Sequence, residues 1–354
     1  MENVFYFKDI NSIGGVETFF YYLSCKYKNM VVYYKKGDTK QIERLAKNIE
    51  VRKFENKKIK CKRFFCCYNP DILDYVDAEH YFHIVHCDYK EVNFNPITNE
   101  KFNHYIGVSQ RVCDSFKELT GLNCELIYNP IFIDKKPLKS IKMYNDNKIH
   151  LISATRLSPE KGKERIIKLA DLLDKAGINY EWEIYTNKRI IFQSPNIKLK
   201  KEKLNILEEI KKADFLVQLS THEAFCYSVV ESLVIGTPVI ITDLPVYKEL
   251  KIENGKQAIV CDLDMKNVDI ELIKKGLPPF TYEAPKDNWS KYLSGSCDYD
   301  SNELIKVKVK YSYNDNWLKK QVIRNDIIEI PKWRASVLEA TPVRLGIVGL
   351  IERL

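Results

Sequence analysis

Glycine is scarce in this chain, with 13 residues in 354, about half the usual frequency of about 7%. Each glycine is therefore expected to occupy a turn or a close approach that other residues would not tolerate. No apolar run comes near the roughly 18 to 20 residues that a membrane-spanning helix needs, which excludes an integral membrane protein. Met1 leads into Glu2 and Asn3 rather than a basic and then an apolar segment, so no secretory leader is expected.

The chain also lacks CxxC pairs and the G-x-G-x-x-G fingerprint. Its ten cysteines are scattered, with Cys66 and Cys67 adjacent, which indicates buried thiols rather than a disulfide or zinc framework. We therefore expect a cytoplasmic protein, with peripheral contact at the inner membrane surface left open. Without the fingerprint after its first strand, a dehydrogenase is disfavoured.

The bulk composition is that of a globular enzyme, with 45% hydrophobic and 29% charged residues. The length is about twice that of a usual domain, which predicts two domains and a small third piece. A formal charge of +8 would suit nucleotide phosphates, nucleic acid or a membrane surface. Because lysine is abundant together with isoleucine, asparagine and tyrosine, a general compositional bias explains this charge equally well.

Strand and helix patterns alternate in two successive series, which predicts two Rossmann-like doubly wound α/β domains facing a cleft. The first series begins with a strand at Asn3–Phe7, a loop at Gly14 and Gly15, and a helix through Leu23. Further strands are expected at residues 30–34, 49–54, 81–85, 105–108, 149–154, 181–186, 214–219, 238–242 and 258–262. Helices are expected at residues 39–48, 109–119, around 166–176, 204–212 and 229–235.

A polar linker at residues 135–148 separates the two series, and we place one domain at residues 1–140 and a second at 141–295. Residues 300–354 are predicted to form a small β-rich module. In that module IKVKVKYSY, DIIEI and RLGIVGLI are strand candidates, and Pro331 is expected to open a short helix.

The stretch from Val217 to Pro245 carries the most chemistry. Glu223 follows a predicted buried strand and Glu231 lies in the next helix, at the end of a parallel sheet where ligands bind. Helix-terminal amides can hold a phosphate, and a carboxylate can accept hydrogen bonds from sugar hydroxyls, which together suggest a nucleotide sugar. One alternative stays open for Glu231, because Ser228 to Glu231 has the S-x-x-E spacing of a capping box.

The spacing of these two glutamates resembles the E-x7-E motif of retaining GT-B glycosyltransferases of the family-4 type. ATRLSPEKG at residues 154–162 is similar to that family's R-x-x-x-x-K-G segment, and SIGGVETFF resembles its glycine loop. Similar segments, including YIGVSQRV and IYNPI, follow one another in family order over residues 3–262. The C-terminal module resembles small elements of phage-encoded proteins.

The resemblance implies that residues 1–140 form the acceptor-side domain and residues 141–295 the nucleotide-sugar-binding domain. It also implies a role for each matching residue. Arg156 and Lys161 would hold the donor diphosphate, Glu231 the ribose and Glu223 a sugar hydroxyl, while His86 would steady the sugar from the first domain. Preorganised cations are suited to this reaction because negative charge grows on the leaving phosphate. The remaining donor-binding positions implied by the family are Gly14, Gly15, Phe225, Cys226, Tyr227 and Ser228.

Two departures from the family pattern put the donor sugar in question. Ala224 and Cys226 stand where glycines usually flank Phe225, and LPVYKEL lacks the glycine pair usually found before Glu249. A metal site at His83, His86, Cys87 and Asp88 is a rival interpretation of FHIVHCDY. We expect no cofactor and no metal.

The sequence thus predicts a retaining transfer of sugar from a nucleotide diphosphate sugar, a UDP-sugar by preference, to an acceptor hydroxyl. A nucleotide-sugar epimerase on the same fold and a non-catalytic binding protein are the alternatives. The acceptor could be a glycan, a lipid-linked sugar or a protein. The basic segment at residues 52–63 is interpreted as a solvated helix or loop, or as a contact for an anionic polymer or membrane. No nucleic acid partner is expected, and the C-terminal module is a candidate for homo-oligomer contacts.

Overall fold

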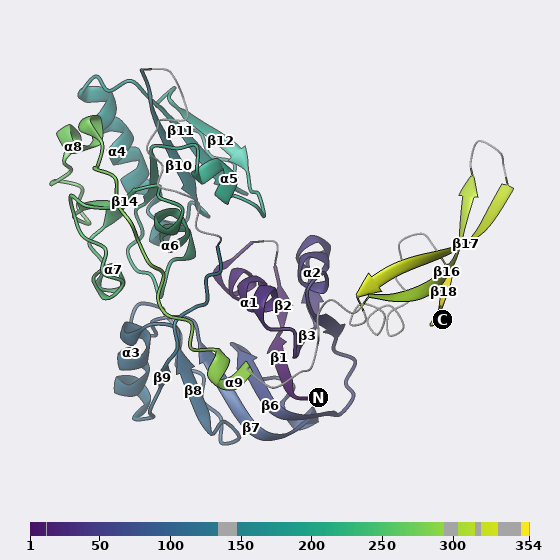
Figure 1. Cartoon of the computed structure of the whole chain (residues 1–354). Helices are drawn as coiled ribbons and strands as arrows, with labels where there is room; N and C mark the ends of the chain where they lie inside the picture. The colour runs from purple at the N-terminus through teal and green to yellow at the C-terminus, as the bar shows by residue number, and fades with distance from the viewer. Residues whose placement is uncertain (12, 134–146, 294–303, 316–319, 332–347, 354) are drawn as a thin grey trace. The chain divides into compact units, whose positions relative to one another are not determined.

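The computed structural model describes residues 1–11, 13–133, 147–293, 304–315, 320–331 and 348–353 (Figure 1). The chain divides into two compact units, Met1–Ser294 and Gly295–Leu354. The first unit contains two parallel sheets, one on each side of residues 134–146. The predicted boundary at residue 140 and most of the linker lie outside the described residues.

The N-terminal lobe is built on a seven-stranded parallel sheet in the order β5-β3-β1-β6-β7-β8-β9. Its strands are β1 (Asn3–Phe7), β3 (Met30–Tyr34), β5 (Glu50–Lys53), β6 (Ile59–Cys67), β7 (Val76–Val85), β8 (His104–Gly107) and β9 (Glu125–Leu126), and β2 (Asp9–Ile10) pairs with β4 (Lys36–Gly37) beside it. Its helices are α1 (Gly15–Lys26), α2 (Thr39–Ala46) and α3 (Gln110–Thr120). All five residues of β1 are buried, as expected of a strand covered on both faces.

The predicted start and stop signals of α3 are confirmed. The Ser109 hydroxyl accepts a hydrogen bond from the Val112 amide, and Gly121 ends the helix at φ +73°. These are the N-cap and the left-handed terminator that the residue types predict.

Strand β6 corrects the interpretation of the basic segment at residues 52–63 as a solvated helix or loop. Ile59 and Cys61 are buried while Lys60 and Lys62 are exposed, so basic and apolar residues alternate along a strand. The strand then continues into Phe64 and lies at the centre of the sheet. The lysines obscured a period-two pattern whose apolar half belongs to the core.

The C-terminal lobe contains a six-stranded parallel sheet in the order β12-β11-β10-β13-β14-β15. Its strands are β10 (Ile149–Ala154), β11 (Tyr180–Thr186), β12 (Ile197–Lys201), β13 (Phe215–Gln218), β14 (Val239–Thr242) and β15 (Ala258–Cys261). Its helices are α4 (Lys163–Lys175), α5 (Leu207–Ile210), α6 (Tyr227–Val234), α7 (Pro245–Glu249) and α8 (Ile270–Lys275). The predicted apolar stripe of α4 is buried at Ile166, Leu169, Ala170 and Leu173. The helix expected at 204–212 is confirmed only as the short α5, and β12 was not predicted.

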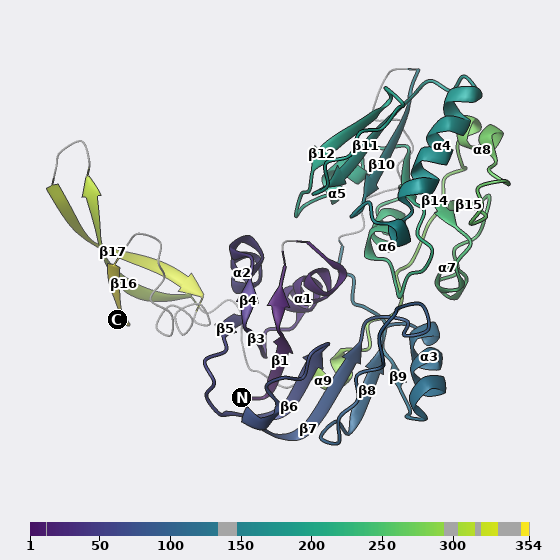
Figure 2. The ribbon, with the colours of Figure 1, turned by 180° about the vertical axis from the view of Figure 1, so that it is seen from behind.

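After the C-terminal lobe the chain returns to the N-terminal lobe, which the predicted domain 141–295 did not anticipate. In both ribbon views the short helix α9 (Ser290–Leu293) lies beside the N-terminal sheet (Figures 1 and 2). Trp289, just before it, is fully buried, packs against Phe19 and donates a hydrogen bond from Nε1 to the Tyr128 carbonyl at 3.0 Å. The last described residues of the first unit therefore pack against its N-terminal lobe.

In the second unit β16 (Leu304–Asp315) pairs antiparallel with both β17 (Lys320–Pro331) and β18 (Val348–Arg353), in the order β17-β16-β18. These strands overlap the three strand candidates of the sequence, and residues 344–347 of the third candidate lie outside the described residues. Pro331 is the last residue of β17, and the helix expected to start there falls outside the described residues.

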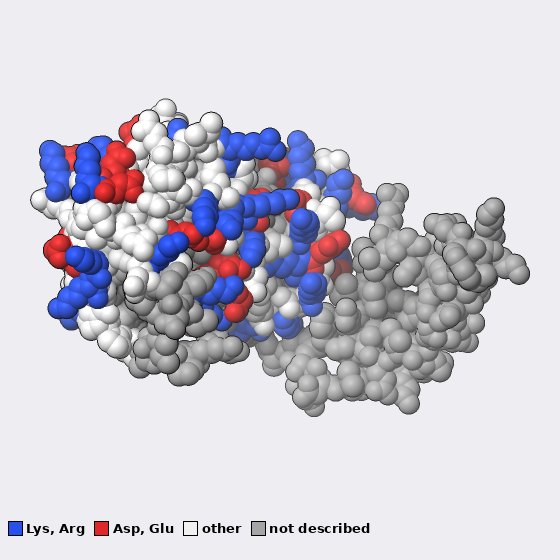
Figure 3. Space-filling view, turned by 90° about the horizontal axis from the view of Figure 1, so that it is seen from above, with Lys and Arg blue, Asp and Glu red and all other residues white. Residues whose placement is uncertain are grey.

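Charged side chains are mixed on the face of the first unit that Figure 3 shows, where Lys and Arg are interspersed with Asp and Glu. The excess of basic residues therefore does not gather into one large patch on that face. Among the described residues, no helix has the length and apolar character needed to cross a membrane.

Candidate functional site

A glycine turn holds the loop that follows β10 against the end of β13. Residues Pro159–Lys161 form a single 3-10 turn, and Gly162 follows at φ +83°. A Cβ atom at Gly162 would lie 1.9 Å from the Leu219 carbonyl oxygen, so no other residue fits there. The Thr221 amide also donates to the Glu160 carbonyl at 2.8 Å. The predicted cationic segment is thereby fastened to the loop that carries Glu223.

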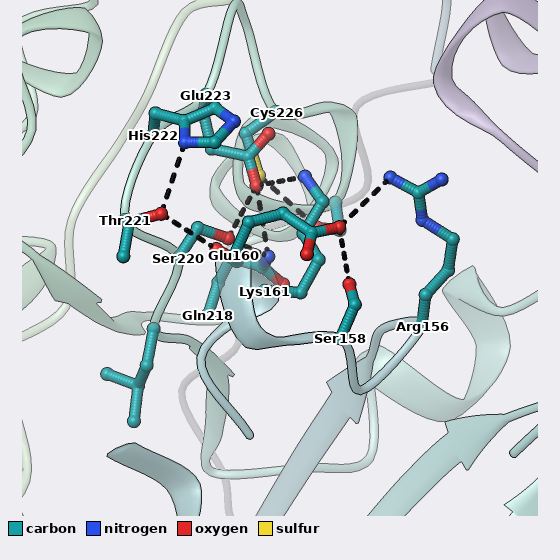
Figure 4. Close-up of polar contacts among 12 residues, drawn as sticks. Arg156, Ser158, Glu160, Lys161, Gln218, Ser220, Thr221, His222, Glu223 and Cys226 are labelled. Carbon is teal, nitrogen blue, oxygen red and sulfur yellow. Dashed lines mark hydrogen bonds and ion pairs between the residues drawn. The ribbon is translucent and has the colours of Figure 1, made fainter. Parts of the chain in front are cut away.

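Lys161 and Glu223 form the central ion pair of the site, with Nζ and Oε1 2.7 Å apart (Figure 4). The same carboxylate oxygen accepts hydrogen bonds from the Ser220 hydroxyl at 2.6 Å and from Gln218 Nε2 at 3.2 Å. Both charged side chains are largely buried, at 19% and 9% exposure. Burial alone would lower the pKa of Lys161, but the Glu223 carboxylate outweighs it and raises that pKa, so the ammonium stays charged.

Arg156 lies at the open edge of the site, with 65% of its side chain exposed. Its Nη2 is 3.8 Å from Glu160 Oε1, and the Ser158 hydroxyl donates to the same carboxylate oxygen. Figure 4 shows the Glu160 carboxylate between Arg156 and Lys161. The structure therefore brings Arg156, Lys161 and Glu223 together, with Lys161 largely buried in an ion pair and Arg156 exposed beside Glu160.

Glu231 is 8% exposed and lies on α6, where its Oε1 accepts a hydrogen bond from the Tyr22 hydroxyl of α1 at 2.7 Å. Burial raises the pKa of Glu231, and the Tyr22 hydrogen bond opposes that rise. The capping-box alternative is wrong, because α6 starts at Tyr227 with Cys226 as its N-cap and has no side-chain cap hydrogen bond. Glu231 therefore satisfies no backbone amide at that helix start and faces the other lobe.

The residues between the two glutamates pack tightly. Phe225 and Tyr227 are buried, with Tyr227 stacked on Tyr22 at a centroid distance of 5.7 Å. Cys226 adopts φ +65°, a left-handed conformation that favours glycine. The backbone at position 226 therefore takes a conformation suited to glycine although the residue is a cysteine. Ser228 is half-buried near the Cys226 thiol, 3.6 Å from sulfur to oxygen.

The glycine loop of the first domain starts α1. Gly14 is its N-cap, in extended backbone, and a Cβ atom there would lie 2.3 Å from Glu17 Oε2, whereas Gly15 has open space around its Cα. Glu17 accepts a hydrogen bond from the Asn11 amide at 2.8 Å. Burial raises the pKa of Glu17, and the Arg156 charge acts against that rise, which places this loop within electrostatic reach of Arg156.

His86 directly follows β7, as expected, and its contacts lie within the N-terminal lobe. Its Nε2 is 3.3 Å from the Cys67 sulfur, and its ring packs edge-on against Phe19 at a centroid distance of 5.0 Å. Burial lowers the pKa of His86 to about 3, so the imidazole is neutral at ordinary pH. The neutral ring can donate or accept a hydrogen bond but brings no positive charge.

The rival metal interpretation of FHIVHCDY is wrong for these residues. His83 is fully buried in the N-terminal core, and the Asp88 carboxylate is bonded to Arg111 Nε at 2.7 Å. Over the described ranges, no group of three or more His, Cys, Asp or Glu side chains is arranged to hold a metal ion.

Sequence reasoning missed three contributors. Gln218 and Ser220 orient Glu223, and their only signal was their place at the end of a buried strand. Tyr22 gave no signal, because its partner lies 209 residues away. Glu249, noted as a departure, accepts from the Gln110 amide at 2.6 Å and the Arg111 amide at 3.3 Å, so it caps α3 in the other lobe.

Residues 134–274 match the family described as "Glycosyl transferases group 1", a span that contains Arg156, Lys161, Glu223 and Glu231. Anabaena Alr3699/HepE, solved in complex with UDP and glucose, is similar over 78% of this chain and 89% of its own, with 15% identity and a TM-score of 0.61. A glycosyltransferase from Rickettsia africae is similar over 74% of this chain and 84% of its own, with 13% identity and a TM-score of 0.54.

The lipopolysaccharide outer core galactosyltransferase WaaB is similar over 77% of this chain and 88% of its own, with 14% identity and a TM-score of 0.52. The comparison with curated protein sequences gave no match. At these identities the structural likeness establishes the fold, and the expected α/β architecture with two parallel sheets is confirmed.

Proposed function

We propose that this protein is a retaining glycosyltransferase that moves a sugar from a nucleotide diphosphate sugar, a UDP-sugar by preference, to an acceptor hydroxyl without a metal ion. The observation that carries the proposal is the Lys161–Glu223 pair, fixed at the carboxyl end of β13 with Arg156 beside it. The group 1 family match over these residues supports it, as does the fold shared with an Anabaena protein solved with UDP and glucose.

The two cations suit departure of the diphosphate. When the bond between the sugar and the phosphate breaks, negative charge grows on the leaving oxygen, and cations already in place stabilise it more than they stabilise the intact donor. Lys161 is buried, charged and oriented by Glu223, so it needs little reorganisation. Arg156 is exposed and only loosely paired with Glu160, so its guanidinium can turn to the other phosphate and bind two oxygens at once.

The carboxylates of Glu223 and Glu231 and the neutral imidazole of His86 can form hydrogen bonds with the hydroxyl groups of the sugar and the ribose. Glu223 has a second oxygen that can accept from a sugar hydroxyl, while Glu231 can accept from ribose hydroxyls. His86 can form a neutral hydrogen bond to the sugar from the N-terminal lobe. The acceptor proton would pass to an oxygen of the leaving phosphate as the new bond forms on the face that the diphosphate leaves.

The test is turnover of UDP-sugars in the presence of a chelator. We expect the enzyme to release UDP from one UDP-sugar and to transfer the sugar to an acceptor, or to hydrolyse the donor slowly when no acceptor is present. NMR spectra recorded early in the reaction should show that the sugar keeps its anomeric configuration. Lys161→Met should lower kcat by about 10² to 10³, the cost typical of removing one preorganised stabiliser of developing charge. Lys168→Met, on the exposed face of α4, is the matched control and should leave kcat unchanged.

Other outcomes favour the alternatives. Conversion of the UDP-sugar to an epimer without transfer would support the epimerase. Failure of the wild type to bind any nucleoside diphosphate would support a non-catalytic binding protein. Inversion of configuration would contradict the retaining mechanism, and loss of turnover in chelator would contradict metal independence.

A further inference from the structure

Two cysteine thiols meet over Gly107, the last residue of β8. Cys113 lies near the start of α3, and Cys124 directly precedes β9, which pairs with β8. A Cβ atom at Gly107 would lie 2.5 Å from Cys113 Sγ and 3.1 Å from Cys124 Sγ, so the two sulfurs occupy the space that a side chain would fill. In both ribbon views α3 lies beside β8 and β9 (Figures 1 and 2). The fold therefore brings one thiol from each of two neighbouring segments to one place.

The two thiols differ in acidity and in exposure. The hydrogen bond between them lowers the pKa of Cys113 and raises that of Cys124, while burial opposes the first shift and adds to the second. Cys113 is 4% exposed, and Cys124 is half-buried. The thiolate is the reactive form of cysteine, so Cys113 is the better nucleophile and Cys124 keeps its proton.

The adjacent cysteines Cys66 and Cys67 have a different environment. Both are fully buried on β6, where successive side chains point to opposite faces of the sheet. Burial raises the pKa of both thiols, which keeps them protonated and unreactive. Their proximity in sequence therefore does not make them a reactive pair, whereas the two thiols over Gly107 are brought together by the fold.

The segments that carry the two reactive thiols also hold Glu249 of the C-terminal lobe. The Glu249 carboxylate accepts hydrogen bonds from the amides of Gln110 and Arg111 at the start of α3. Tyr128, just after β9, forms a hydrogen bond with the same carboxylate. A covalent bond between the thiols would therefore join the two segments of the N-terminal lobe that contact Glu249.

We propose that Cys113 and Cys124 form a redox-active dithiol, which hydrogen peroxide converts to a disulfide that fastens the start of α3 to the segment before β9. Peroxide is named as the oxidant because it is small and Cys113 is nearly buried. This inference does not depend on the proposed function. Disulfides of this kind, when they form inside cells, are usually transient and sense oxidants.

The reaction has two steps. The Cys113 thiolate attacks one oxygen of hydrogen peroxide, the O–O bond breaks, and the departing hydroxide takes up the proton that Cys113 released, which gives a sulfenic acid and water. The Cys124 sulfur then attacks the Cys113 sulfur, the S–O bond breaks, and the hydroxide leaves as water with the Cys124 proton. The two sulfurs together lose two electrons and the peroxide gains them. A small dithiol reverses the change by thiol–disulfide exchange.

The test is treatment of the full chain with hydrogen peroxide, followed by blocking of free thiols, proteolysis and mass spectrometry without reduction. We expect the Cys113–Cys124 disulfide to be at least about tenfold more abundant than any other cysteine pair, and to disappear with dithiothreitol. Cys124→Ala should leave Cys113 as a sulfenic acid that dimedone traps. Cys25→Ala, at an exposed cysteine, is the matched control and should form the disulfide as the wild type does.

Two further measurements report on the fastening of α3. Oxidation should raise the melting temperature of the wild type and of Cys25→Ala by about 4 °C or more, because the bond restricts the unfolded chain, and should not raise that of Cys124→Ala. Hydrogen exchange at the amides of Gln110 and Arg111 should slow by about threefold or more in the oxidised wild type, because local opening at the start of α3 becomes rarer.

The contrary results are distinct. Wild type in which Cys113 and Cys124 stay free after peroxide treatment, or pair with other cysteines, would overturn the proposal. Faster oxidation of Cys25 than of Cys113 would show that reactivity follows exposure alone and would overturn it as well. A disulfide that forms but changes neither the melting temperature nor the exchange of the two amides would overturn the claim that it fastens α3.

Discussion

Cys226 combines a side chain and a backbone conformation that rarely occur together. At φ +65° a residue with a Cβ atom pays roughly 1 to 2 kcal/mol that glycine does not pay. We therefore expect Cys226→Gly to be more stable than Cys226→Ala by about 1 kcal/mol, the reverse of the usual order. Urea unfolding of the two variants checks this, and an alanine variant as stable as the glycine variant would mean that position 226 is not left-handed.

His83 makes the stability of the fold depend on pH. Burial lowers its pKa to about 4, below the value of about 6.5 of an unfolded histidine. Between these values the unfolded chain binds a proton that the folded chain does not, so stability is lost as pH falls from 6.5 toward 4. We expect this loss to be smaller in His83→Leu by up to about 1.4 kcal/mol per pH unit, measured by urea unfolding at pH 7, 6 and 5. An identical pH dependence in both proteins would contradict the burial of a neutral ring.

Individual residues of the site were predictable where their chemistry shows in local sequence. Glu223, Arg156 and Lys161 follow buried strands, and the ends of parallel strands meet at one edge of a sheet, so the sequence placed them together. The Tyr22–Glu231 bond was not predictable, because no local pattern reports a partner in another lobe. The capping-box spacing at Ser228 was misleading because the N-cap is Cys226, so the helix starts two residues earlier than that spacing implies.

At the scale of elements, Gly162 joins the turn that carries Lys161 to the end of β13. Alanine there would meet the Leu219 carbonyl oxygen at 1.9 Å and would also be strained at φ +83°. We expect Gly162→Ala to destabilise the fold by more than about 3 kcal/mol, since backbone must move. Gly177→Ala is the control: it has φ +64° but open space, and should cost only about 1 kcal/mol. Equal melting temperatures for the two variants would refute the close approach.

Most elements follow from their own sequence, and the exceptions have physical reasons. The continuous apolar runs of β1 and β10 and the stripe of α4 are strong signals. Strand β6 was missed because exposed lysines alternate with its first buried residues, so that composition resembled a surface loop. Segment 204–212 has a helical pattern, but only one turn of it is α-helix, and its first residues line a pocket beside Glu231.

At the scale of the whole molecule, the return of the chain to the N-terminal lobe depends on Trp289. The side chain is fully buried among aromatic rings, including Phe19 and Phe65, and donates to the Tyr128 carbonyl. We expect Trp289→Ala to destabilise the first unit by about 3 to 5 kcal/mol, as for other buried tryptophans. Chemical unfolding followed by tryptophan-independent circular dichroism measures it, and a loss below about 1 kcal/mol would contradict this anchoring.

Contacts between the two lobes explain how a site with residues from both can be assembled. Tyr22 reaches Glu231, and Glu249 caps α3 from the C-terminal lobe. The sequence predicted two domains facing a cleft from its two α/β series. Which side chains bridge them could not be predicted, because that depends on how the lobes meet in space rather than on any period along the chain.

The most direct test of the central claim is calorimetric titration of the full chain with UDP in the presence of EDTA, for wild type and Lys161→Met. The account predicts saturable binding by the wild type that chelation does not weaken, and at least tenfold weaker binding by the variant, because a buried cation that contacts the diphosphate is lost. Equal affinity in the two proteins would contradict the assignment of Lys161 to the diphosphate. Absence of binding by the wild type to UDP and to GDP would contradict a nucleotide-sugar donor site altogether.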